Sequence, residues 1–357
     1  QSALGAEPAD TDEFLVSDAG TLKRVDYSYI KPTAQVYRDA QPIAINGNFE
    51  VWQRGTSFTT SVYTADRWKQ DLSGATATVS QQTFTIGQSD VPNNPKYYLR
   101  QAASTANNNC GIFYRHEDVT TLTGNITIAF YAKGTNPNGG NLHIITKQDF
   151  GSGGSTAVET STQNITLTGS WQQFVFNFSL ASISGKTVGA NSYLQMLIKQ
   201  PDGDGSTNAW TLDLANFQVE EGTYTSATLP PFQSETYGSN ESRCLRYFEK
   251  TYEVGVNPGT ATSTGIIRSG GNQGGRTSGR MGGGTTYVVG KRAAPTVVFY
   301  DSSGNSAVMS RIDQGSGSGT SQNATLASGS SKSMEVTSTG TYTGDVMNYH
   351  FTADAEL

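Results

Sequence analysis

The sequence has little charge and almost no cysteine. Only 15% of its 357 residues are charged, and the two cysteines, Cys110 and Cys244, lie far apart. Such a pair forms neither a disulfide framework nor a closely spaced metal knuckle. We therefore expect two free thiols in a chain that folds in a reducing cytoplasm, with one long-range bridge as the alternative.

Long apolar runs and basic blocks are also missing. No stretch of eighteen apolar residues occurs, so we expect no membrane-spanning helix and no membrane insertion. The first residue is not Met, and no signal-peptide pattern follows it, so residue 1 is expected to be internal to a longer or processed chain. The formal net charge is −6 without clustered Lys or Arg, which argues against a nucleic-acid partner.

Small and polar turn-forming residues are abundant. Forty glycines lie in a background rich in Ser, Thr and Asn, which is typical of many short strands joined by turns. The predicted fold class is all-β, and the length allows two or three domains. The expected units are an N-terminal connector (1–42), a sandwich domain (43–226), an extended linker (227–240) and a distal β-rich domain (241–357).

The connector contains a hairpin pattern. Apolar patches at 14–16 and 22–30 flank the turn sequence S-D-A-G at 17–20. A single hairpin is marginally stable by itself. We therefore expect it to pack on another chain or on the rest of the protein.

Strand periodicity defines the sandwich domain. Apolar residues alternate along several segments and place one face of each in a core, at 126, 128 and 130, at 174, 176 and 178, and at 194, 196 and 198. Near residue 215 the apolar positions change from even (Trp210, Leu212, Leu214) to odd (Phe217, Val219). This phase change predicts a β-bulge at Ala215 and Asn216. In the distal domain, strands are expected at 287–289, 296–300 and 346–351, with glycine-rich turns at 269–284.

Catalytic patterns are absent. The three histidines occur singly, and no metal-ligand or nucleophile motif surrounds them. His116 shares a strand face with Ile112 and Tyr114, which suits an ordinary strand residue or a ligand contact. No pair of acids can be placed at glycosidase spacing. We expect no enzymatic activity and no catalytic residues.

Six segments occur in a recognisable order: I-N-G-N-F-E-V-W-Q-R-G (45–55), T-A-D-R-W (64–68), G-I-F-Y-R-H-E-D-V (111–119), N-I-T-I-A-F-Y-A-K-G (125–134), S-W-Q-Q-F-V-F-N-F (170–178) and W-T-L-D-L-A-N-F-Q-V-E-E-G (210–222). Together they resemble jelly-roll carbohydrate-binding modules, particularly those carried by bacteriophage tail fibres. The later segments C-L-R-Y-F-E-K (244–250) and Y-H-F-T-A-D-A-E-L at the end extend the similarity. The resemblance covers roughly residues 43–357.

This resemblance implies a structural calcium ion. In such modules a Glu after Gly-x-Phe and an acidic or amide residue of the final strand often hold Ca²⁺, which prefers oxygen ligands. The matching positions are Glu50 with Asp213 or Asn216, and main-chain oxygens near Asn46 and Asn48 would complete the site. The alternative is that Glu50 caps a turn or pairs with Arg54 or Arg67.

The resemblance also implies a sugar-binding cleft. Aromatic faces stack on sugar rings while polar groups bond the hydroxyls. The candidates on central strands are Tyr114, His116, Tyr131 and His143.

The implied function is adsorption to a host. We expect a non-enzymatic virion component, made in the host cytoplasm, that forms a homotrimer, joins other tail proteins through its N-terminal region and binds a bacterial surface polysaccharide. The alternatives are a structural spacer without receptor contact and the carbohydrate-binding module of a polysaccharide depolymerase.

Overall fold

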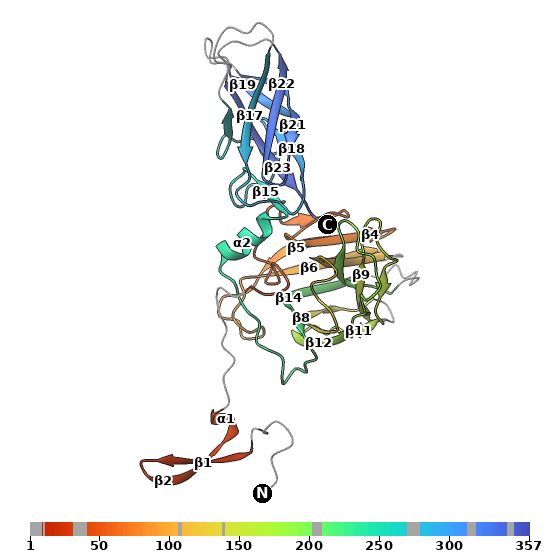
Figure 1. Ribbon diagram of the computed structural model, residues 1–357, viewed down its shortest axis with the longest axis vertical. Coiled ribbons are helices and arrows are strands. Elements are labelled where there is room, and N and C mark those ends of the chain that lie inside the picture. Colours follow the sequence, from red (N-terminus) through yellow and green to blue (C-terminus); the bar gives the residue numbers. More distant parts are fainter. Residues whose placement is uncertain are drawn as a thin grey trace.

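A computed structural model describes residues 9, 11–30, 41–105, 109–137, 140–201, 209–269, 279–312, 319–340 and 346–357. Nearly all regular structure in these ranges is antiparallel β-sheet, so the predicted all-β class is confirmed (Figure 1). No helix in them is long and apolar enough to cross a membrane. Parts of the expected connector and of the glycine-rich tract 269–284 lie outside the described residues.

The first sheet of the central sandwich has the order β10-β9-β13-β7-β4, with β11 paired to β9. Its strands are β4 (Trp68–Ser73), β7 (Asn109–Glu117), β9 (Leu142–Asp149), β10 (Val158–Glu159), β11 (Gln163–Ile165) and β13 (Tyr193–Lys199). Alternate residues are buried, as predicted for Leu194, Met196 and Ile198. Successive strand side chains point to opposite sides, so this sheet has a core face and an outer face.

The second sheet has the order β12-β8-β14-β6-β5-β3. Its strands are β3 (Ser57–Phe58), β5 (Thr76–Thr83), β6 (Tyr97–Thr105), β8 (Asn125–Thr135), β12 (Gln172–Ser179) and β14 (Trp210–Glu221). The predicted inward residues Ile126, Ile128 and Phe130 all lie in the shared core. That core centres on Trp68, whose ring lies 4.9 Å from Phe49 and 4.8 Å from Phe217, measured between centroids.

The predicted β-bulge is present in β14. The pairing of β14 with β8 shifts register between Ala215 and Gln218, and Asn216 adopts a positive φ of 46°. The extra residue lets both Leu214 and Phe217 face the core. At the bulge, the Phe217 amide donates to the Gly47 carbonyl at 2.9 Å, which fastens the segment before β3 to the last strand of the sandwich.

A helix leads into the C-terminal unit. The linker is extended up to Thr236, but 237–240, expected to be extended as well, already belong to α2 (Tyr237–Leu245). The Thr236 hydroxyl accepts a hydrogen bond from the Ser239 amide at 3.4 Å, an N-cap that starts the helix.

The C-terminal unit contains two antiparallel sheets. The larger sheet consists of β15 (Phe248–Lys250), β16 (Ile267–Ser269), β18 (Thr296–Tyr300), β19 (Val308–Ile312), β20 (Gly319–Asn323) and β23 (Val346–Asp354). The smaller sheet consists of β17 (Gly279–Thr286), β21 (Thr325–Gly329) and β22 (Ser333–Gly340). Phe299, Met347 and Phe351 contribute to a separate core. The strand predicted at 287–289 is wrong, because β17 ends at Thr286.

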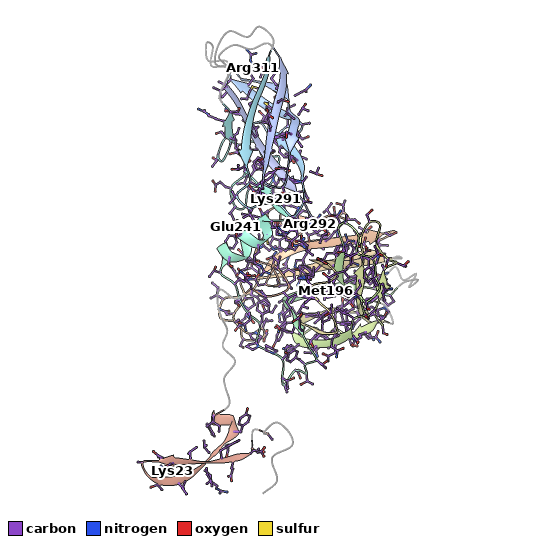
Figure 2. The ribbon with its side chains drawn as sticks, in the orientation of Figure 1. Lys23, Met196, Glu241, Lys291, Arg292 and Arg311 are labelled. Atoms are coloured by element: carbon purple, nitrogen blue, oxygen red, sulfur yellow. The ribbon has the colours of Figure 1, made fainter. Side chains whose placement is uncertain are left out.

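The C-terminal unit is joined to the sandwich by polar contacts. Arg67 is fully buried, forms an ion pair with Glu356, and lies with its guanidinium 3.4 Å from the Tyr247 ring centroid. Arg292 donates to the Ala355 carbonyl at 2.9 Å and to Asn191 Oδ1 at 2.7 Å, and Figure 2 shows it at the meeting point of the two units. The sandwich therefore holds the end of β23 directly.

The N-terminal hairpin is formed by β1 (Glu13–Asp18) and β2 (Thr21–Asp26), followed by the short α1 (Tyr27–Ile30). Its turn falls at the predicted position, and its register pairs Phe14 with Val25 and Leu15 with Arg24. Apolar side chains are exposed on both faces, including Leu15 at 72%. Two strands alone are marginal, so this hairpin lacks a core of its own.

Candidate functional site

The outer face of the first sheet carries one continuous row of side chains. Tyr63 pairs with Lys69, which lies opposite Phe113 on β7, and the row continues through Leu197 to Ile145. Directly paired residues share a face. Neighbouring strands lie about 4.8 Å apart, so this outer-face row spans about 19 Å.

Cations and aromatic rings alternate along this face. The Arg115 guanidinium lies 4.1 Å from the Tyr193 ring centroid and 4.6 Å from that of Phe113, and its Nε donates to Gln195 Oε1 at 2.9 Å. Phe113 itself is only 4% exposed, so Arg115 and Tyr193 form the accessible surface above it. Rings and polar groups held together in this way suit a ligand with apolar faces and many hydroxyls.

The acids on this face are already partnered. Tyr193 donates its hydroxyl to Asp149 at 3.1 Å, and Lys147 lies 3.5 Å from the same carboxylate. Glu117 accepts hydrogen bonds from Arg246 and Tyr247, both at 2.8 Å. Burial raises the pKa of Glu117, but these donors outweigh it and leave the pKa below its usual value. A general acid needs a raised pKa, and Glu117 does not have one.

The four predicted sugar-binding residues do not gather in one place. Tyr114 is a correction: it is fully buried, and its hydroxyl contacts the Ile43 carbonyl at 3.3 Å and the Ile45 amide at 3.2 Å. His116 shares this inward face, as expected from its position. His143 lies on the outer face of β9, opposite Lys199. Tyr131 packs beside Trp171 and Phe84 on the outer face of the other sheet.

His116 is a titratable group with a structural environment. Burial and the nearby Arg67 lower its pKa from 6.5 to about 4. Because the unfolded chain binds this proton more readily, the contribution to stability is present above pH 6.5 and is lost as the pH falls toward 4. Between pH 7 and pH 5 the loss is about 2 kcal/mol.

We expect the free energy of unfolding to fall more steeply from pH 7 to pH 5 in the wild type than in His116→Gln. Urea titrations at several pH values measure the difference. Asp66 makes a contribution to stability that changes with pH in the opposite direction, because burial raises its pKa to about 6. Since Asp66 is present in both proteins, its contribution cancels when they are compared. Equal slopes in the two proteins would show that His116 is not held neutral by its surroundings.

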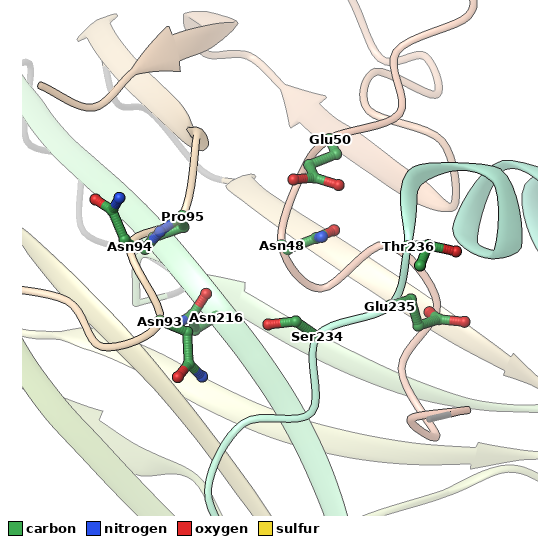
Figure 3. A pocket seen from close by; sticks show the side chains of 9 residues that line it. All are labelled: Asn48, Glu50, Asn93, Asn94, Pro95, Asn216, Ser234, Glu235 and Thr236. Carbon is green, nitrogen blue, oxygen red and sulfur yellow. The ribbon is translucent and has the colours of Figure 1, made fainter. Parts of the chain in front are cut away.

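A second site lies at the β14 bulge. A pocket of about 480 Å³ is lined by Asn48, Glu50, Asn93, Asn94, Pro95, Asn216, Ser234, Glu235 and Thr236. Figure 3 shows Asn48 and Glu50 on one segment, with Asn94 and Asn216 on neighbouring segments. Ser234 lies on the segment that continues to Glu235 and Thr236. Three of the five residues predicted to hold calcium, Asn48, Glu50 and Asn216, therefore line one pocket.

The other two predicted ligands lie elsewhere. The Asn46 side chain is used by the backbone: its Nδ2 donates to the Val51 carbonyl at 2.9 Å and to the Asp66 carbonyl at 3.0 Å. Asp213 accepts two hydrogen bonds from Arg100, at 2.6 and 2.7 Å. Of the two alternatives for the final strand, Asn216 and not Asp213 therefore lines the pocket. The main-chain oxygen of Asn46 accepts from the Phe49 amide at 3.1 Å and from Trp68 Nε1 at 3.3 Å.

The oxygen donors of the pocket are of the kind that a hard cation prefers. Glu50 supplies a carboxylate, and the asparagines and Ser234 supply neutral oxygens, whereas the Glu235 carboxylate is already paired with Arg243 at 2.8 Å. Burial raises the pKa of Glu50. The alternative pairing of Glu50 with Arg54 or Arg67 is wrong, since these arginines pair with Asp66 and Glu356. Within the described ranges no three His, Cys, Asp or Glu side chains cluster as a metal site.

Comparisons with known proteins give partial matches in fold. No protein-family model matches the sequence, and no curated protein matches it. The solved structures to which the chain is partly similar are mainly β-sandwich carbohydrate-binding modules. The xylan-binding domain CBM22-2 of Xyn10C from Paenibacillus barcinonensis is 12% identical over 46% of this chain and 98% of that one, with a TM-score of 0.29.

Two further structures show a similar extent of likeness. TmCBM61, solved with β-1,4-galactotriose, is 12% identical over 51% of this chain and 100% of that one, with a TM-score of 0.29. The enzymatically active domain of tailspike protein 4 from bacteriophage CBA120 is 12% identical over 50% of this chain and 21% of that one, with a TM-score of 0.30. Likeness of this degree does not identify a ligand or an activity.

Proposed function

We propose that the chain is a non-enzymatic receptor-binding protein of a phage tail fibre, whose sandwich binds a bacterial surface polysaccharide. The order of the six segments from 45 to 222 supports this, together with the all-β fold. The observation that carries the binding role is the outer face of the first sheet, where Arg115, Tyr193 and Gln195 form a fixed surface of rings and hydrogen-bonding groups.

The proposal includes a homotrimer in the virion. Three copies of the hairpin could bury the apolar side chains that one copy exposes on both faces, and this end would join other tail proteins. Weak single-site sugar contacts gain avidity when several copies engage one surface at once. Light scattering of the full chain gives the number of copies, and a monomer in solution would contradict the trimer.

Binding is tested on an array of purified capsular polysaccharides and lipopolysaccharides. We expect Tyr193→Ala to weaken binding about tenfold, because the variant removes the accessible ring of the face. Tyr131→Ala is the matched control on the other sheet, and its binding should stay at the wild-type level. If only Tyr131→Ala loses binding, the glycan-binding site lies on the other sheet.

The alternatives have different outcomes. Wild-type protein that binds no glycan on the array supports the spacer, in which recognition takes place elsewhere in the particle. Release of reducing sugar from a bound polysaccharide would establish a depolymerase. The proposed function requires binding without release.

The proposal also includes a calcium ion at the β14 bulge, held by Glu50, Asn48 and Asn216. When bound, the ion would supply positive charge that ties the segment before β3 to the last strand. Calcium at ten times its Kd should stabilise the fold by about 1.4 kcal/mol.

We expect calcium to raise the melting temperature of the wild type but not that of Glu50→Gln. Glu220→Gln is the control, since burial also raises the pKa of this carboxyl but it lies outside the pocket lining. Differential scanning calorimetry with calcium and with a chelator measures the effect. If the melting temperature of the wild type does not depend on calcium, the proposed calcium site is contradicted.

A further inference from the structure

A pocket of about 400 Å³ lies between the sandwich and the C-terminal unit. Tyr63 and Lys69 line it from the sandwich, and Phe248, Tyr300 and Asp354 line it from the C-terminal unit. Tyr63 and Lys69 also begin the outer-face row. The pocket is therefore continuous with the face proposed to bind glycan.

The walls of this pocket are fixed. The Arg54 guanidinium lies 3.7 Å from the Phe248 ring centroid and 5.3 Å from that of Tyr63. The Tyr63 hydroxyl donates to the main-chain oxygen of Leu357 at 2.5 Å, and Arg115 donates to the same oxygen at 2.6 Å. Leu357 thus contacts both the pocket wall and the outer face, so the two surfaces keep one geometry.

Most charges in the pocket are already paired. Arg54 lies 3.3 Å from Asp66, 3.2 Å from Asp354 and 3.3 Å from Glu356. Asp354 is the acid nearest the opening, with its side chain 41% exposed, and its contact with Arg54 offsets its charge. The three carboxylates face two guanidinium groups, those of Arg54 and Arg67, so this cluster carries one net negative charge and does not itself attract an anion.

Lys69 is the charged residue of this pocket that has no such ion pair among the described residues. Its ammonium lies 5.5 Å from the Tyr63 ring centroid and 5.8 Å from that of Phe113. No ion pair joins it to a carboxylate among the residues that the structure describes. A cation without an anionic partner favours an anionic ligand. Because aromatic rings lie beside this cation, the ligand that fits best carries its anion on a ring that can lie against them.

We propose that this pocket binds a carboxylate-bearing sugar residue, with Lys69 pairing with the carboxylate and Tyr63 or Tyr300 lying against the ring. The receptor class is then an acidic polysaccharide, an inference that rests on the proposed glycan-binding function. The Arg54 fork is occupied, so Lys69 would hold the anion as a point charge, and a loss of binding when the carboxyl groups of the glycan are reduced distinguishes a carboxylate from a phosphate.

The test uses the full chain on an array with acidic and neutral bacterial polysaccharides. We expect the tightest binding to acidic members, and chemical reduction of the carboxyl groups of a bound glycan should weaken binding about tenfold. Lys69→Gln should cause a similar loss and should bind the native and the reduced glycan equally. The control Lys133→Gln removes a cation that lies 5.1 Å from the Trp171 ring centroid on the outer face of the other sheet.

The outcomes separate the two proposals. Binding to neutral glycans only, or a loss that is equal in Lys69→Gln and Lys133→Gln, would overturn the assignment of Lys69 while leaving glycan binding intact. Binding to no glycan at all removes the function on which the assignment rests. Circular dichroism of Lys69→Gln confirms that a loss does not come from misfolding.

Discussion

Replacement of Arg67 by methionine is expected to lower the free energy of unfolding by about 3–5 kcal/mol. Arg67 is fully buried, pairs with Glu356 and donates to the Arg115 carbonyl. Its removal leaves the Glu356 carboxylate, itself only 3% exposed, without this cation in a low-dielectric environment. The loss should fall first on the contact between the C-terminal unit and the sandwich.

Calorimetry of the full chain measures this effect as a lower melting temperature of the unit that contains β23. The control is Arg24→Met, which removes an exposed ion pair with Glu13 on the hairpin and should cost less than about 1 kcal/mol. The double variant Arg67→Met with Glu356→Gln should recover part of the loss, since the buried Glu356 carboxylate would otherwise keep only its 3.3 Å contact with Arg54. If the double variant is as unstable as the sum of its parts, the pair does not act as a unit.

Strand alternation predicted most of the sandwich because it follows from local geometry. The inward residues of β8 and β13 and the bulge at Ala215 are where the period of two placed them. The same alternation argues against Tyr114 as a ligand contact, because it shares the Ile112 face. The choice of Tyr114 followed residue type, whereas alternation selects Phe113 and Arg115 for the outer face.

The pocket at the β14 bulge was only partly predictable from the sequence. Asn48, Glu50 and Asn216 were predictable from the resemblance and the bulge. Asn93 and Glu235 lie in segments without periodic pattern, and they reach the pocket through long-range contacts, such as Asn93 Nδ2 donating to the Phe232 carbonyl at 3.0 Å. No local signal encodes such a contact. The junction pocket likewise depends on how two units meet, which neither unit's periodicity specifies.

Gly47→Ala is expected to destabilise the sandwich by about 3 kcal/mol. A Cβ at this position would lie 2.0 Å from the Phe217 carbonyl oxygen, a main-chain atom that cannot rotate away. The segment would have to move, which loses the hydrogen bond from the Phe217 amide to the Gly47 carbonyl. Overpacking typically costs about 1–3 kcal/mol and a lost hydrogen bond about 1 kcal/mol.

The movement would also displace Asn48 and Glu50 from Asn216, so Gly47→Ala should lose any stabilisation by calcium together with intrinsic stability. Gly169→Ala is the matched control, because a Cβ there meets no atom within 4 Å and the backbone has no positive φ. Its stability should stay within about 1 kcal/mol of the wild type. If both alanine variants unfold at the wild-type urea concentration, the close approach of Gly47 to the bulge does not hold the first segment to the last strand.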